Sequence, residues 1–130
     1  MNAFPITSLY AGILGLMLLW LSLRIVAVVR AKGEVNYGDA GNPEYTTIVR
    51  GQANFVEYVP MIVILMALNE ASGTSAAWLH GEGVAIVVAR LLHPFGMKPE
   101  PGVNVMRFVG TMTTWIVLTI VSIQAILHSL

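Results

Sequence analysis

The chain has 130 residues, of which 56% are hydrophobic and only 11% charged, and its mean hydropathy is +0.74. Soluble domains carry roughly 25% charged residues, so an ordinary soluble domain is excluded, as is a disordered chain, which needs low hydrophobicity. Seven Lys and Arg balance seven Asp and Glu, which leaves no basic excess for nucleic acid phosphates. Because cysteine is absent, any thiol chemistry must use the thiol of a substrate.

Four long apolar segments follow one another along the chain, at about 4-30, 45-70, 76-93 and 103-127. The first lacks the positive start and short apolar run of a signal peptide, so we expect a retained span. The second is polar in its first third and contains Pro60, which a membrane helix tolerates. About 20 apolar helical residues cross a bilayer, and glycine- and proline-rich stretches separate the segments. The sequence therefore predicts an all-α, integral membrane four-helix bundle that forms a single domain over 1-130.

The cations predict the direction of these spans. With four spans, the first and third loops lie on the same side of the membrane. All seven Lys and Arg fall in those two loops or in the helix ends that enter them: Arg24, Arg30, Lys32, Arg50, Arg90, Lys98 and Arg107. Cytoplasmic loops collect Lys and Arg. We therefore expect a multi-pass protein whose N- and C-termini are both on the non-cytoplasmic side.

The second segment carries a polar stripe near its cytoplasmic end. At 100° per residue, Arg50, Asn54 and Glu57 lie within about 60° of one another, Tyr58 lies at the edge, and Gln52 points nearly the opposite way. A charged group at the centre of a membrane helix costs about 2.5–3.5 kcal/mol and usually marks function. The alternative is that Arg50 and Glu57 only neutralise each other. We favour function, because the stripe holds more polar residues than one ion pair needs.

The other segments also bring cations to this end. Arg90 and His93 share a face of the third segment, Arg107 lies near the start of the fourth, and Arg30 ends the first. Taken singly, Arg90 is explained as a snorkelling cation and His93 as an interfacial polar residue. Together, this many Arg residues favour an anionic ligand, because Arg makes bidentate contacts to carboxylates. Glu57 would suit an ammonium group, so a ligand with two carboxylates and one ammonium fits.

Metal and nucleotide sites have no support in the sequence. The three histidines, His80, His93 and His128, lie in different places and no paired-His motif occurs. Glycine-rich phosphate-binding motifs are also absent. We therefore expect no metal site.

The stretch that begins at Arg50 reads R-G-Q-A-N-F-V-E-Y-V-P. It resembles the signature of the MAPEG family, the membrane-associated proteins in eicosanoid and glutathione metabolism, which has Arg, Asn four later, Glu three later, an aromatic residue and Pro. Residues 37–44, Y-G-D-A-G-N-P-E, look like the same loop in bacterial members, and A-R-L-L-H at 89–93 is similar to the third-helix motif. Arg107 occupies about the place of the fourth-helix Arg. The resemblance covers nearly the whole chain.

The resemblance implies a homotrimer in the bacterial inner membrane, with sites between subunits that bind glutathione as co-substrate at the cytoplasmic end. The positions that match or adjoin glutathione-binding positions of the family are Arg30, Arg50, Gln52, Asn54, Glu57, Tyr58, Arg90 and His93. Arg107 would be the catalytic residue, since a guanidinium beside a thiol lowers the thiol pKa and the thiolate then attacks a lipophilic electrophile. The sequence departs from several of the enzymes at Met97, where they have a second Tyr.

Three functions compete at this point. The first is a glutathione transferase or peroxidase that acts on lipophilic small molecules. The second is a relative that binds lipids or other ligands without chemistry, which Met97 favours. The third is a small multidrug-type transporter that exchanges protons at a membrane-embedded Glu. It ranks last, because Arg50 and Asn54 on the same face favour the charged form of Glu57. The expected partners are further copies of the chain, membrane lipids and a lipophilic substrate, without nucleic acid.

Overall fold

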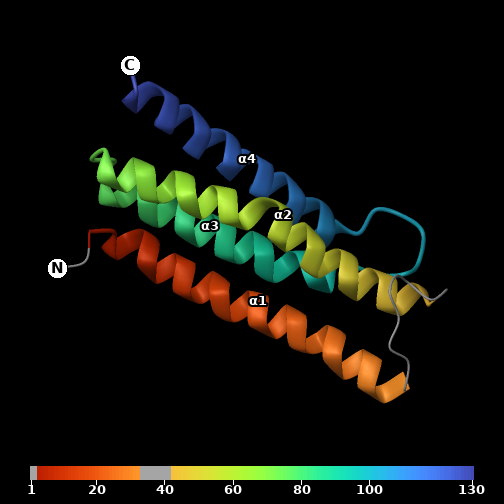
Figure 1. Ribbon diagram of the computed structural model, residues 1–130. Coiled ribbons are helices and arrows are strands. Elements are labelled where there is room, and N and C mark those ends of the chain that lie inside the picture. Colours follow the sequence, from red (N-terminus) through yellow and green to blue (C-terminus); the bar gives the residue numbers. More distant parts are fainter. Residues whose placement is uncertain (1–2, 33–41) are drawn as a thin grey trace.

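Four α-helices make up the fold (Figure 1). The computed structural model describes residues 3–32 and 42–130, and these form no strand. The helices are α1 (Pro5–Lys32), α2 (Pro43–Ala71), α3 (Ala76–Phe95) and α4 (Val105–His128). This confirms the predicted all-α bundle. The loop motif at 37–44 lies largely outside the described residues, since only 42–44 belong to them.

Three helices, α1, α2 and α4, are long and apolar enough to cross a membrane by length and composition. α3 has 20 residues, which at 1.5 Å per residue spans about 30 Å, the thickness of a bilayer core. It is not among the three candidate spans, and it carries two charged residues and two histidines: His80, Glu82, Arg90 and His93. α3 packs along its neighbours, so the chain forms an integral membrane four-helix bundle.

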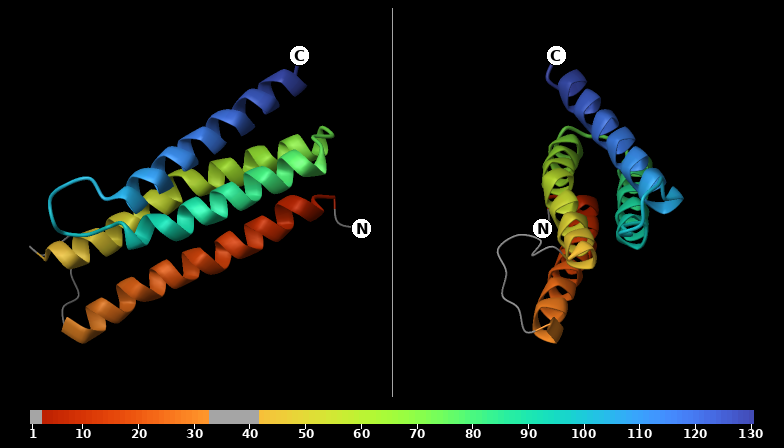
Figure 2. Two further views of the ribbon diagram at one scale, coloured as in Figure 1. Left: turned by 180° about the vertical axis from the view of Figure 1, so that it is seen from behind. Right: turned by 90° about the vertical axis from the view of Figure 1, so that its right-hand side faces the viewer.

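The helices run alternately up and down, so that both ends of the described chain lie at the same end of the bundle (Figure 1). α2 and α3 separate α1 from α4, and the two outer helices diverge in both views of Figure 2. The turn that joins α2 to α3 lies at the end with the termini, and the loop that joins α3 to α4 lies at the opposite end. This second end holds the polar first third of α2.

Local sequence explains where the helices begin and end. The Asn42 side chain accepts hydrogen bonds from the backbone N–H groups of Glu44 and Tyr45, and Asn104 caps α4 in the same way. Asn is among the preferred residues at this position because its side-chain oxygen replaces a missing backbone acceptor. Pro60 leaves α2 a continuous helix, whereas Pro94 falls in the last turn of α3, which ends one residue later.

The interior is a column of apolar side chains contributed by all four helices. Its fully or almost fully buried members are Tyr10, Leu14, Leu21, Phe55, Val59, Ile62, Met66, Ile86, Val117 and Val121. Large apolar side chains also cover the outside, as expected for a surface that faces lipid: Leu16 is 70% exposed and Ile116 58% exposed. Because lipid is as apolar as the interior, close packing and polar contacts must hold the helices together.

Two glycines permit the close packing around α3. A Cβ on Gly110 would lie 2.8 Å from the carbonyl oxygen of Ala89, so this glycine lets α4 approach the α3 backbone. A Cβ on Gly83 would overlap the ring of Tyr10, which packs from α1. Small residues at such crossings are typical of membrane helix packing.

Candidate functional site

The predicted site residues of α2 leave the helix in three directions. Arg50 and Glu57 project outward from the protomer, where their side chains are 58% and 48% exposed. Nη1 of Arg50 lies 3.6 Å from Oε1 of Glu57, two helical turns further on. Gln52 turns toward α1, where its Nε2 donates to Ser22 Oγ at 3.4 Å. Asn54 turns inward, toward α3.

Arg90 is the centre of a buried polar cluster that joins three helices. Its side chain is fully buried. Nη2 donates to Asn54 Oδ1 on α2 at 2.8 Å, and Nη1 donates to Thr114 Oγ1 on α4 at 3.2 Å. The guanidinium carbon also lies 5.8 Å from the ring centre of Phe55, a cation–π distance. Arg90 is therefore held inside the protomer and does not snorkel to the helix end.

This cluster keeps unused hydrogen-bonding capacity. Among the described residues, Nε of Arg90 and Nδ1 of His93 are buried and have no hydrogen-bond partner. No described carboxylate lies within ion-pair distance of Arg90. A buried positive charge that has only neutral hydrogen-bond partners raises the electrostatic potential around it, which favours an anion nearby.

His93 lies one turn beyond Arg90 and is 2% exposed, so it belongs to the helix contact rather than to the interface with water. A Cβ on Gly110 would lie 3.0 Å from the Cβ of His93. The close approach of α4 therefore encloses the imidazole. The structure brings Asn54 of α2 and the pair Arg90 and His93 of α3 to one region of the bundle.

Arg107 lies in the first turn of α4, and two features fix its backbone. Its N–H donates to the capping oxygen of Asn104, and Gly96 at the end of α3 packs so closely that a Cβ there would overlap the Arg107 backbone. The side chain is exposed and lines a cavity of about 290 Å³ with Phe108 and Met112. Its guanidinium makes no ion pair with a described residue.

Arg107 and Arg30 are not bonded to the predicted site residues of α2, although Arg107 lies close enough to His93 for an electrostatic interaction. Arg30 is exposed in the last turn of α1. Within one protomer, neither guanidinium makes a hydrogen bond or ion pair to Arg50, Asn54 or Glu57 among the described residues. Tyr58 is half-buried and packs against the apolar column.

Thr114 is a member of the buried cluster that the sequence did not reveal. Its hydroxyl accepts from Arg90 and donates to the Gly110 carbonyl at 2.7 Å. A lone Thr in an apolar helix gives little signal, because such hydroxyls routinely bond the carbonyl four residues earlier in their own helix. The described residues contain no group of three or more metal-ligating side chains.

Comparison with known proteins identifies the relatives of this chain. The sequence model of the MAPEG family matches residues 7–127, nearly the whole chain. The inner membrane protein YecN of Escherichia coli (strain K12) is 33% identical over 91 residues, which cover 70% of this chain and 69% of that protein. YecN of Escherichia coli O6:H1 matches to the same extent. With a four-helix membrane bundle and a family match of this length, the chain belongs to the MAPEG family.

Proposed function

We propose that this protein is a membrane-bound, glutathione-dependent transferase or peroxidase that acts on lipophilic electrophiles. The observation that carries the proposal is the outward-facing pair of Arg50 and Glu57, at the same end of the bundle as the buried Arg90 cluster. Exposed charges within a membrane helix are costly, and they usually mark a ligand or partner.

A homotrimer would complete the site. Neighbouring subunits would cover the Arg50–Glu57 surface and enclose a polar cleft between them. Arg30 and Arg107, whose guanidinium groups make no ion pair with a described residue, would reach the cleft from the same or an adjacent subunit. Since the cations gather at this end, we place the cleft at the cytoplasmic side of the bacterial inner membrane, with both termini on the other side.

Glutathione fits the groups at this end. It has two carboxylates, one ammonium group and one thiol. Arg50 and Arg30 would bind the carboxylates, Glu57 the ammonium, and Gln52 and Tyr58 would supply further polar contacts. The buried cluster of Arg90, Asn54 and His93 would form the wall behind them and add positive potential.

Arg107 would stabilise the thiolate, since a neighbouring guanidinium favours the charged form of a thiol. In the transferase reaction, the thiolate sulfur forms a bond to an electrophilic carbon, and the leaving group departs with the bonding electrons. In the peroxidase reaction, two glutathione molecules are oxidised to the disulfide while a hydroperoxide is reduced to an alcohol and water. The apolar cavity beside Arg107 would admit a substrate from the bilayer.

A ligand-binding relative without chemistry is the second candidate. The Arg107 guanidinium makes no ion pair with a described residue, which favours this candidate. Met97 also favours it, because several of the enzymes have a Tyr at that position; the Met97 side chain lies 3.8 Å from the Cβ position of Gly51. The small multidrug-type transporter is disfavoured, because Glu57 already faces Arg50 at 3.6 Å.

Turnover by Arg107→Ala separates these candidates. With glutathione and a lipophilic aryl halide or organic hydroperoxide, we expect Arg107→Ala to lose about 100-fold or more in rate, the usual cost of removing one group that stabilises an anion. Lys98→Ala, which removes another exposed cation of the same end, should retain activity. Wild-type turnover in Arg107→Ala, with an unchanged elution volume, would refute the catalytic role.

A further inference from the structure

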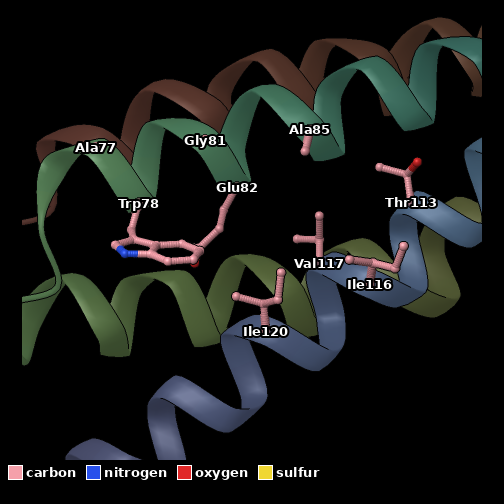
Figure 3. Close-up of a pocket in the computed structure, with 9 residues that line it drawn as sticks. All are labelled: Ala77, Trp78, Gly81, Glu82, Ala85, Thr113, Ile116, Val117 and Ile120. Carbon is pink, nitrogen blue, oxygen red and sulfur yellow. The ribbon is translucent and has the colours of Figure 1, made fainter.

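A second cavity lies between α3 and α4, in the half of the bundle that holds the chain termini (Figure 3). It has a volume of about 320 Å³, which lies within the range of small-molecule sites. Trp78, Ala85 and Ile120 are among its apolar lining residues. The glutathione site proposed above is at the opposite end, so this cavity is independent of it.

Glu82 is the charged residue in the lining. It is 4% exposed, and neither carboxylate oxygen has a hydrogen-bond partner among the described residues. Figure 3 shows Glu82 and Trp78 extending from α3 toward α4. Gln124 is the polar neighbour of the carboxylate. Its amide oxygen accepts from Asn69 at 3.1 Å, which leaves its NH2 group facing Glu82, but Gln124 is neutral and cannot balance the charge. A buried carboxylate without a cation to balance it is costly, and ionisable residues within spans usually mark a ligand or ion site.

Among the described residues, none supplies a cation for this carboxylate. Arg90, on the same face of α3, is eight residues away, about 12 Å along the helix axis, and its guanidinium is bound to Asn54 and Thr114. His80 pairs with the hydroxyl of Tyr10. The described residues form no ion pair to Glu82. A positive charge that balances this carboxylate must therefore come from outside the described residues, or the carboxyl stays neutral.

We propose that this cavity binds a small lipophilic molecule that carries one protonated amine, with Glu82 as its counter-ion. The apolar walls take the hydrocarbon part, and the carboxylate sets the preference for a cation. A phospholipid with an amine headgroup fits less well, because its phosphate would approach Glu82 and no Lys or Arg of the lining could bind it.

Tryptophan quenching provides the test, since Trp78 lines the cavity. Trp20→Phe and Trp115→Phe leave Trp78 as the only indole, and the protein is reconstituted in phosphatidylcholine vesicles. It is titrated with an ω-bromoalkylammonium ion and with the ω-bromoalkanol of the same length. We expect the ammonium ion to quench at a concentration at least about tenfold lower than the alkanol does. This difference in affinity corresponds to one hydrogen bond to a charged group.

Two variants test whether Glu82 causes the preference for the ammonium ion. Glu82→Gln should bring the two compounds within about twofold of each other, whereas Glu100→Gln, a matched change in the exposed α3–α4 loop, should keep the tenfold preference. Equal quenching by both compounds with Glu82 present overturns the proposal, even if Glu82→Gln fails to fold. Loss of ammonium quenching in vesicles that contain phosphatidylethanolamine also overturns it, since a lipid headgroup would then be the occupant.

Discussion

The hydrogen bond between Asn54 and Arg90 should contribute more to stability than any other side-chain contact in the buried cluster. Arg90 is fully buried and Asn54 accepts its shortest hydrogen bond, at 2.8 Å. Asn54→Ala leaves the guanidinium with Thr114 as its remaining side-chain acceptor. Loss of a hydrogen bond to a buried charge costs about 1.5–3 kcal/mol, so we expect the free energy of unfolding to fall by about 2 kcal/mol.

The same substitution should cost little once the charge is gone. Arg90→Met places an apolar chain of similar length in the same space, which for buried charges is often close to neutral. In that background, Asn54→Ala should cost less than about 1 kcal/mol, because Asn54 is only half-buried and no longer has a charged partner. The coupling free energy between the two positions should therefore be at least about 1 kcal/mol.

Reversible unfolding in mixed micelles, followed by circular dichroism, gives the free energies for this double-mutant cycle. Arg24→Met is the matched control, since Arg24 stacks over Trp20 at 5.1 Å and makes no contact with Asn54. Asn54→Ala and Arg24→Met should be additive within about 0.5 kcal/mol. If the effects of Asn54→Ala and Arg90→Met on the free energy of unfolding also add within about 0.5 kcal/mol, the assignment of Arg90 as the residue that holds the three helices together is refuted.

Two further predictions concern the packing and the opposite end of the bundle. Gly110→Ala should destabilise the protein by about 1–3 kcal/mol, because the new methyl group meets the Ala89 carbonyl, whereas Gly12→Ala, where nothing lies within 4 Å, should stabilise it by about 0.5–1 kcal/mol. Thermal unfolding of the two variants measures this, and equal shifts would contradict the packing. Glu70→Ala should lower stability by about 1–2 kcal/mol, because the Glu70 carboxylate accepts the N–H groups of Ile6 and Thr7 and caps α1. Hydrogen exchange at these amides should rise in that variant, and unchanged exchange would contradict the cap.

The number of helices was predictable because hydropathy and breaker residues determine it, but the rotation of the helices was not. α1 is apolar on every side: Leu14 is 1% exposed and Leu16 is 70% exposed, although both are leucines in the same uncharged run. In a membrane the inner and outer faces of a helix can carry the same residue types. Which leucines face the bundle therefore depends on the shape of the neighbouring helices.

The polar residues of α2 were predictable as a group, but their partners were not. The sequence places Arg50, Asn54 and Glu57 on one face of the helix, but it does not show which edge of that face turns toward the bundle. In the structure the edge with Asn54 turns inward to Arg90, while Arg50 and Glu57 remain outside. Thr114 could not be anticipated, because its role follows from the crossing of α3 and α4 at Gly110.

Glutathione binding to the detergent-purified protein, measured by calorimetry, tests the central claim most directly. The proposed function predicts that glutathione binds to the wild type. Arg50→Ala and Glu57→Gln should each lose at least about tenfold in affinity, as expected when a charged contact to the ligand is removed, and Glu100→Gln should keep the wild-type affinity. Absence of binding to the wild type, or equal affinity in all four proteins, would contradict a glutathione site on this face of α2.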